Sequence, residues 1–174
     1  MPEKRIYHRR TGTRLMFVPL FFLSFLIYSN TFQSSWHLDD YQNIVYNNRV
    51  HVDEFSPQSL SQAIRPQLYD KIWRPVSFLT FAVNWYFGRD NVFGYPFVNI
   101  LNHALTSWVI FQTVDWIFST PVLRDKYGDG EYLIALISAV LLAVNPIHTQ
   151  AVTYIIQRMT LLATLFYILS LLCY

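Results

Sequence analysis

The sequence predicts an all-α protein: a polytopic bundle of transmembrane helices whose first loop is large and extracytoplasmic. Of its 174 residues, 53% are hydrophobic and 14% are charged, whereas soluble domains carry about 25% charged residues. Long apolar stretches recur along the chain, and polar segments separate them. The net charge of +2 argues against a nucleic-acid partner. The single cysteine, Cys173, excludes a disulfide framework.

The first predicted span covers residues 15–32, which contain no charged side chain. About 20 helical residues cross the hydrocarbon core. The stretch is longer than the apolar part of a typical signal peptide, and no small-x-small cleavage site follows it, so we expect an uncleaved anchor. Basic residues precede it and place the N-terminus in the cytoplasm: Lys4, Arg5, Arg9, Arg10 and Arg14.

Residues 33–95 form the predicted outer loop, since no long apolar run survives there. Within it, residues 75–87 have the features of a short helix. Pro75 suits a first helical position and Gly88 suits a C-terminal cap. The helix is too short to cross a bilayer. We therefore expect it to lie on the membrane surface.

Residues 96–118 form the second predicted span. One face of it is polar, because four polar residues recur at helical spacing, and such a stripe faces protein rather than lipid: Asn99, Asn102, His103 and Thr106. Arg124 and Lys126 place the following turn in the cytoplasm. The third span, residues 132–145, is short and ends where Pro146 interrupts the helix.

A fourth predicted helix covers residues 148–174. Polar residues at steps of three and four predict one face turned toward protein: Gln150, Thr153, Gln157, Thr160 and Thr164. The apolar run reaches Tyr174 without a polar flank, which leads us to expect a fragment of a longer protein.

Asp39 and Asp40 are the first candidate functional pair. Adjacent carboxylates at a membrane surface can share a proton or bind a divalent cation, and either arrangement suits a general base. The alternative is a solvated loop or a helix N-cap. Arg74, at the entry to the surface helix, suits a phosphate or pyrophosphate. Its alternative role is to reach lipid headgroups.

Arg158 is the only charged residue after Glu131. An arginine two turns into an apolar helix needs a partner or a watery cavity, or else reaches the interface. His148 is a further candidate, with a structural hydrogen bond as its alternative. The predicted topology puts these groups together at the outer face, where they would form a site for a lipid-linked phosphate substrate.

Three stretches resemble the GT-C type of membrane glycosyltransferase, and most of all the transmembrane and tetratricopeptide-repeat containing (TMTC) family and its bacterial relatives. They are WHLDDYQNIVYN at 36–47, RPVSFLTFAVNWYFG through GYPFVNILNHAL at 74–105, and the segment from NPIHTQ to the end at 145–174. The resemblance implies transfer of a sugar from a polyprenyl phosphate donor to an acceptor such as a protein hydroxyl, on the periplasmic or lumenal side. Tetratricopeptide repeats would follow the membrane region.

The resemblance also implies residue roles. Asp39 and Asp40 would be the base or the ligands of a divalent metal such as Mg²⁺ or Mn²⁺, and Arg74 and Arg158 would hold the donor phosphate. The pocket would be lined by His37, His103, His148 and Gln150. The chain departs from the family pattern twice: it has Asn145 where many relatives have His, and Gln150 where they have Glu.

Two other classes stay open. A noncatalytic membrane scaffold would use the polar stripes only to pack helices. A transporter is disfavoured because no span carries an acid at its centre, Asp115 lying toward the inner end. The motif QRM at 157–159 resembles the bacterial relatives and favours a bacterial inner membrane as the location of the protein. For a eukaryotic protein we would expect the endoplasmic reticulum membrane. We expect no turnover from the 174 residues alone.

Overall fold

The computed structural model describes residues 15–65, 73–127 and 130–174, and every regular element within these ranges is helical. The all-α prediction is therefore confirmed for the described residues. The elements in chain order are α2 Phe17–Ile27, η1 Ser29–Gln33, a π-helical turn η2 Tyr41–Val45, α3 Pro57–Ala63, α4 Pro75–Gly88, α5 Gly94–Phe118, α6 Pro121–Tyr127, α7 Glu131–Val144, η4 Pro146–His148, α8 Thr149–Thr153, η5 Ile155–Gln157 and α9 Arg158–Cys173.

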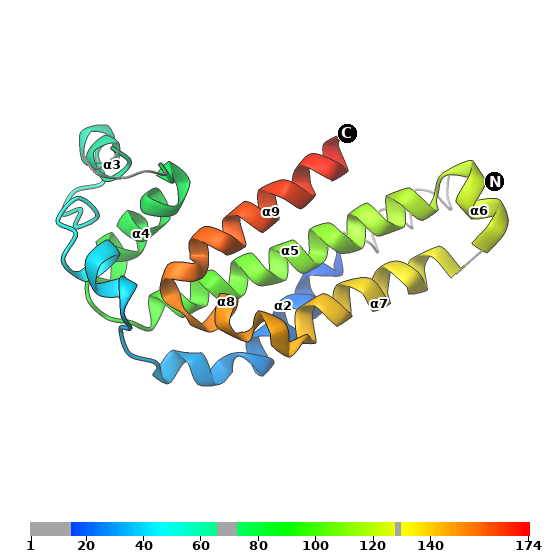
Figure 1. The fold of residues 1–174 in the computed structure, drawn as a ribbon, viewed down its shortest axis with the longest axis horizontal. Coiled ribbons are helices and arrows are strands. Elements are labelled where there is room, and N and C mark those ends of the chain that lie inside the picture. The colour runs from blue at the N-terminus through cyan, green and yellow to red at the C-terminus, as the bar shows by residue number, and fades with distance from the viewer. Residues whose placement is uncertain (1–14, 66–72, 128–129) are drawn as a thin grey trace.

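Helix α5 is the axis of the fold. It runs along the long dimension of the molecule, and α2, α7 and α9 pack against it (Figure 1). The polar stripe predicted on this helix is buried, since Asn99, Asn102, His103 and Thr106 are each at most 5% exposed. The prediction that this stripe faces protein is thus confirmed. Burial of these groups fixes the rotation of α5 within the bundle.

Only one described helix, Ile155–Cys173, is long and apolar enough by itself to cross a membrane. Helices α6 and α7 would count together as a second span, and they are bent by 95°. The span predicted at 15–32 is divided, because α2 ends at Ile27 and a 3-10 turn follows. The polytopic arrangement stays a prediction.

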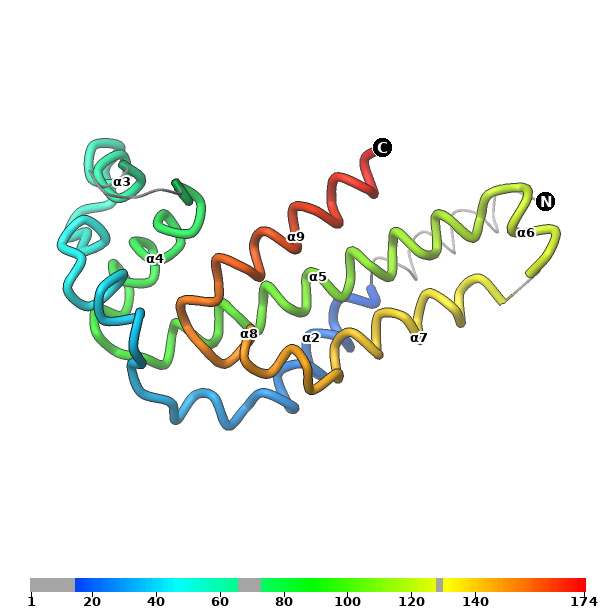
Figure 2. The backbone as a smooth tube through the Cα atoms, viewed as in Figure 1, coloured from blue at the N-terminus to red at the C-terminus, as the bar shows by residue number. Residues whose placement is uncertain are grey.

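The helix predicted over 148–174 is broken, and this is the main departure from the sequence prediction. Tyr154 has ψ 118°, so α8 ends and a 3-10 turn leads into α9 (Figure 2). The Asn99 amide on α5 donates to the carbonyl oxygens of Val152, Tyr154 and Ile155 at 3.2 to 3.3 Å. These bonds satisfy backbone carbonyl groups that lose their helical N–H partners where the helix breaks. The polar residues from Gln150 to Thr164 therefore do not form one continuous face.

The outer loop folds against one end of α5, where α3 and α4 lie (Figure 1). Helix α4 has nearly the predicted bounds. Its polar side turns inward, because Ser77 is buried and Thr80 accepts a hydrogen bond from Arg158. A surface position for α4 in the bilayer stays a prediction, and this end of the bundle is where most of the candidate residues gather.

Candidate functional site

A strained turn carries the paired aspartates. The Asp40 N–H donates to the His37 carbonyl at 2.8 Å, and the His37 N–H donates back to Asp40 Oδ2 at 3.0 Å. Between them Leu38 has φ 36°, a left-handed conformation that a branched side chain rarely adopts. Its side chain is 82% exposed. Such strain concentrates at functional sites, and here the reciprocal hydrogen bonds maintain it.

Asp40 is an anchor between the loop and the broken helix. Its side chain is fully buried, and Oδ1 accepts the Ile156 N–H at 2.9 Å. Both carboxylate oxygens are therefore engaged by backbone donors. Burial raises the pKa of Asp40 above its ordinary value, and the N–H donors of His37 and Ile156 oppose that rise. The geometry gives Asp40 a positioning role.

Asp39 presents its carboxylate to solvent. Its backbone is fixed, because the Asp39 N–H donates to the Tyr154 hydroxyl at 3.2 Å. That hydroxyl in turn donates to the His37 carbonyl at 3.4 Å. The two bonds attach the turn to the break in the helix, so Asp39 is an exposed carboxylate on a rigid base. His37 is exposed beside it.

Arg158 is completely enclosed by the protein. Its Nε donates to Asn99 Oδ1 at 2.9 Å and its Nη2 to the Tyr95 carbonyl at 2.9 Å, while Nη1 lies 3.4 Å from Thr80 Oγ1. The guanidinium also lies over the Phe81 ring, 4.6 Å from the centroid. It thus finds the partners that a buried arginine needs. In this arrangement it joins α4, α5 and α9.

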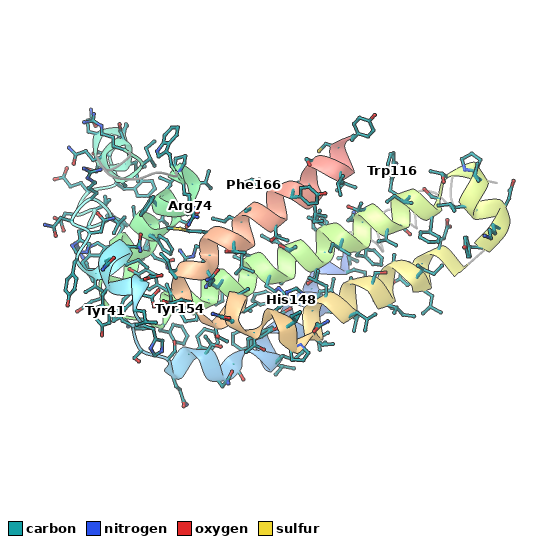
Figure 3. All side chains as sticks on the ribbon, viewed as in Figure 1. Tyr41, Arg74, Trp116, His148, Tyr154 and Phe166 are labelled. Atoms are coloured by element: carbon teal, nitrogen blue, oxygen red, sulfur yellow. The ribbon has the colours of Figure 1, made fainter. Side chains whose placement is uncertain are left out.

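Arg74 differs from Arg158 in being exposed. Its Nη1 donates to Met159 Sδ at 2.9 Å. A thioether is a weak acceptor and occupies one of five N–H donors. Because the side chain is exposed, its guanidinium can bind an anion in bidentate fashion. Figure 3 shows Arg74, Tyr41 and Tyr154 at the same end of the bundle.

The remaining predicted pocket residues lie elsewhere. His103 is buried and bonds through Nε2 to the Ala143 carbonyl, and its ring centroid is 5.6 Å from that of His148. Figure 3 places His148 farther along the bundle. Gln150 is exposed on α8. This five-residue helix, about 7.5 Å long, separates the histidine pair from the break at Tyr154. The residues predicted to share one pocket therefore lie in two separate groups. One group is at the break in the helix, and the other contains His103 and His148.

A divalent metal held by both aspartates does not fit this geometry. The Asp40 side chain is fully buried and its oxygens accept two backbone N–H groups, whereas Asp39 is exposed, and a Mg²⁺ ion held by protein carboxylates usually keeps several waters. Among residues 15–65, 73–127 and 130–174, no group of three His, Cys, Asp or Glu side chains is placed to hold a metal ion.

Two residues that organise the site were not predicted to do so. Asn99 was assigned to helix packing, and it also stabilises the helix break and binds Arg158. Tyr154 was not singled out at all, because nothing in the apolar run marks it as the position where α8 ends. Thr153 and Gln157 keep a helical step of four across this position, so the polar spacing gave no sign of the break.

In sequence, the chain is similar to curated proteins named protein O-mannosyl-transferase of the TMTC group. It is 27% identical over 161 residues to Tmtc1 of Drosophila melanogaster, 30% over 166 residues to TMTC4 of Mus musculus and 31% over 157 residues to TMTC1 of Homo sapiens. These alignments cover 87 to 88% of this chain and 17 to 22% of the relatives' length. No family model matches the chain. No solved structure matches it.

Proposed function

We propose that the chain is part of a GT-C type membrane glycosyltransferase, which transfers a sugar from a polyprenyl phosphate donor to a protein hydroxyl. The observation that carries this proposal is a convergence at the broken helix. The loop with the paired aspartates bonds to Tyr154 and Ile156, and Arg74 contacts Met159. The Asp39 carboxylate and the Arg74 guanidinium are thereby both held against the short segment 154–159. The names of the relatives support mannose as the sugar and protein as the acceptor.

Asp39 is the catalytic base in this proposal. Of the two aspartates it has the exposed carboxylate, whereas Asp40 is buried and bonded on both oxygens. A base must be able to contact the proton that it removes. The Tyr154 hydroxyl and the left-handed turn at Leu38 fix the direction in which Asp39 faces.

Arg74 binds the donor phosphate, since its side chain is exposed and its hydrogen-bond partner among the described residues is a thioether, a weak acceptor. Arg158 acts as a positioning residue. Its bonds to Asn99 and the Tyr95 carbonyl hold the start of α9, and so hold Met159, on which Arg74 rests.

In the reaction, the acceptor hydroxyl oxygen forms a bond to the anomeric carbon of the sugar, and the bond from that carbon to the phosphate oxygen breaks. The hydroxyl proton passes to the Asp39 carboxylate. The polyprenyl phosphate leaves with the bonding electron pair, and Arg74 stabilises the charge that develops on it. No step requires a metal at the aspartate pair.

The site faces the extracytoplasmic side of a bacterial inner membrane in this proposal, with the N-terminus in the cytoplasm. The basic residues before the first apolar stretch support this orientation. Exposed aromatic and apolar side chains near the site, among them Trp73 and Phe87, support a position at the bilayer interface.

The test uses the complete protein in proteoliposomes, with polyprenyl phosphate mannose as donor and a Ser- and Thr-containing peptide as acceptor. Asp39→Asn and Arg74→Ala should each reduce transfer by about 100-fold or more. Asp90→Asn is the matched control, because Asp90 is an exposed acid of the same loop. Unchanged transfer in both site variants would refute the roles of Asp39 and Arg74, and no transfer by the complete wild-type protein would favour a noncatalytic scaffold.

A further inference from the structure

A polar cleft of about 260 Å³ lies in the outer loop, which also carries the paired aspartates. It is formed by the segment between η2 and α3 together with one face of α3. Its walls carry polar and charged side chains and one described apolar side chain, Val52. The polar and charged residues are Asn48, Arg49, His51, Asp53, Glu54, Ser59 and Gln62. The residues proposed for the transfer reaction do not line this cleft.

Contacts with the rest of the loop and with α4 hold the walls of this cleft in place. Val52 is buried, and the His51 ring stacks on Trp85 with centroids 3.5 Å apart. His51 Nε2 also donates to the Ile44 carbonyl at 2.9 Å. On the α3 side, Ser56 Oγ caps the helix by accepting the Ser59 N–H. A ligand would therefore meet a preformed surface, which reduces the entropy lost on binding.

A ladder of asparagines joins the cleft to Asp39. Asn43 Nδ2 donates to the Asp39 carbonyl at 2.8 Å, and Asn47 Nδ2 donates to the Asn43 carbonyl at 3.1 Å. Asn47 Oδ1 then accepts the Arg49 N–H at 3.3 Å, at the edge of the cleft. The proposed base and the cleft thus belong to one hydrogen-bonded unit.

Among the residues that the structure describes, the charges around the cleft balance. Arg49 and Glu54 have opposite signs, and Asp53 forms an ion pair with Arg89. Arg89 has φ 53°, a left-handed conformation in which it forms this pair. One Arg49 nitrogen donates to the Arg65 carbonyl. A balanced set does not select a phosphate, so the cleft is unsuited to the donor's anionic part.

The available groups complement a peptide. Asn48 and Gln62 each offer a carbonyl acceptor and an amide donor, which is the combination that pairs with peptide N–H and C=O groups. Among the described lining residues, His51 carries the one aromatic ring, and one face of that ring is covered by Trp85. From these observations we infer that the cleft binds an extended, neutral polypeptide segment, the acceptor, and presents its hydroxyl group to Asp39. This inference rests on the proposed function.

The test measures binding of a fluorescent neutral peptide of Ala, Ser and Thr to the complete protein without donor. Asn48→Ala and Gln62→Ala should each weaken binding about tenfold. Gln58→Ala is the matched control, since Gln58 is an exposed amide of the same helix and does not line the cleft. Circular dichroism should show the same helical content in all three variants.

Kinetics provide the second readout. The two cleft variants should raise the KM for peptide and leave kcat and the KM for donor unchanged. Equal peptide affinity in the cleft variants and the wild type would overturn the inference, as would displacement of the peptide by free mannose. Peptide binding that depends on the cleft in a protein without transferase activity would support the cleft and refute the proposed function, so the two failures are distinguishable.

Discussion

Asp40 and Ile156, 116 positions apart in the chain, are joined by a 2.9 Å hydrogen bond from the Ile156 N–H to the Asp40 carboxylate. The bond is possible only because α8 ends at Tyr154, since Ile156 in a continuous helix would donate to a carbonyl one turn earlier. The broken helix and the loop with the aspartates are therefore one structural unit, and its stability can be tested residue by residue.

Replacing Asp40 should destabilise the protein. Asp40→Ala leaves the buried Ile156 N–H without its acceptor, at a cost of about 2 kcal/mol in the free energy of unfolding. Denaturant unfolding in detergent micelles, followed by circular dichroism, measures the change. Asp90→Ala, at an exposed position, should stay within about 0.5 kcal/mol of wild type. An equal loss of unfolding free energy in both variants would show that Asp40 is not an anchor.

The ionisation of Asp40 should make stability depend on pH. Its pKa in the folded protein is raised by burial above the ordinary value of 3.8. The folded state then binds the proton more tightly than the unfolded chain. This group alone therefore lowers the free energy of unfolding as pH rises from about 4 through the folded-state pKa. Asp40→Asn should remove that slope, and an unchanged slope would contradict the assignment.

Asn99 should be essential to the helix break. Asn99→Ala removes donors to three carbonyl oxygens and the acceptor for Arg158. A loss of about 3 kcal/mol follows from the number of buried bonds. Hydrogen exchange should accelerate at amides 154–158. Gln150→Ala, an exposed amide on α8, is the control and should leave exchange there unchanged. Wild-type exchange in the Asn99 variant would contradict this role.

Arg158 should not tolerate lysine. A lysine ammonium cannot reach Asn99, Thr80 and the Tyr95 carbonyl with the spacing of a guanidinium fork. We expect Arg158→Lys to lose about 2 kcal/mol of stability. Arg74→Lys, at an exposed position, should lose less than about 0.5 kcal/mol. Equal stability of the two lysine variants would show that Arg158 is not the buried junction described here.

The sequence allowed much of the fold to be predicted, because helix bounds follow from local signals. Pro75 and Gly88 mark α4, and the stripe from Asn99 to Thr106 marks the inward face of α5. The break at Tyr154 could not be predicted, since the bonds that stabilise it come from Asn99, far away in the chain. Local periodicity contains no information about such a partner.

The candidate residues also could be predicted only in part, because their types were informative and their burial was not. Residue type alone identified Asp39, Asp40, Arg74 and Arg158 as unusual in an apolar chain. It did not distinguish the exposed members from the buried ones, because burial depends on tertiary packing: Asp40 and Arg158 are fully enclosed, and Asp39 and Arg74 are not. Asp40 and Arg158 therefore receive positioning roles that sequence reasoning did not give them.

In the proposed site, Asp39 and Arg74 face one common compartment. In a Cys173→Ser background, single cysteines at Asp39 and Arg74 can be labelled with a membrane-impermeant thiol reagent in oriented vesicles. A cysteine at Ser119, beyond the far end of α5, serves as the opposite-side control. We expect the cysteines at positions 39 and 74 to react from the extracytoplasmic side and the one at position 119 to react from the cytoplasmic side. Labelling of the first two from opposite sides would contradict this expectation.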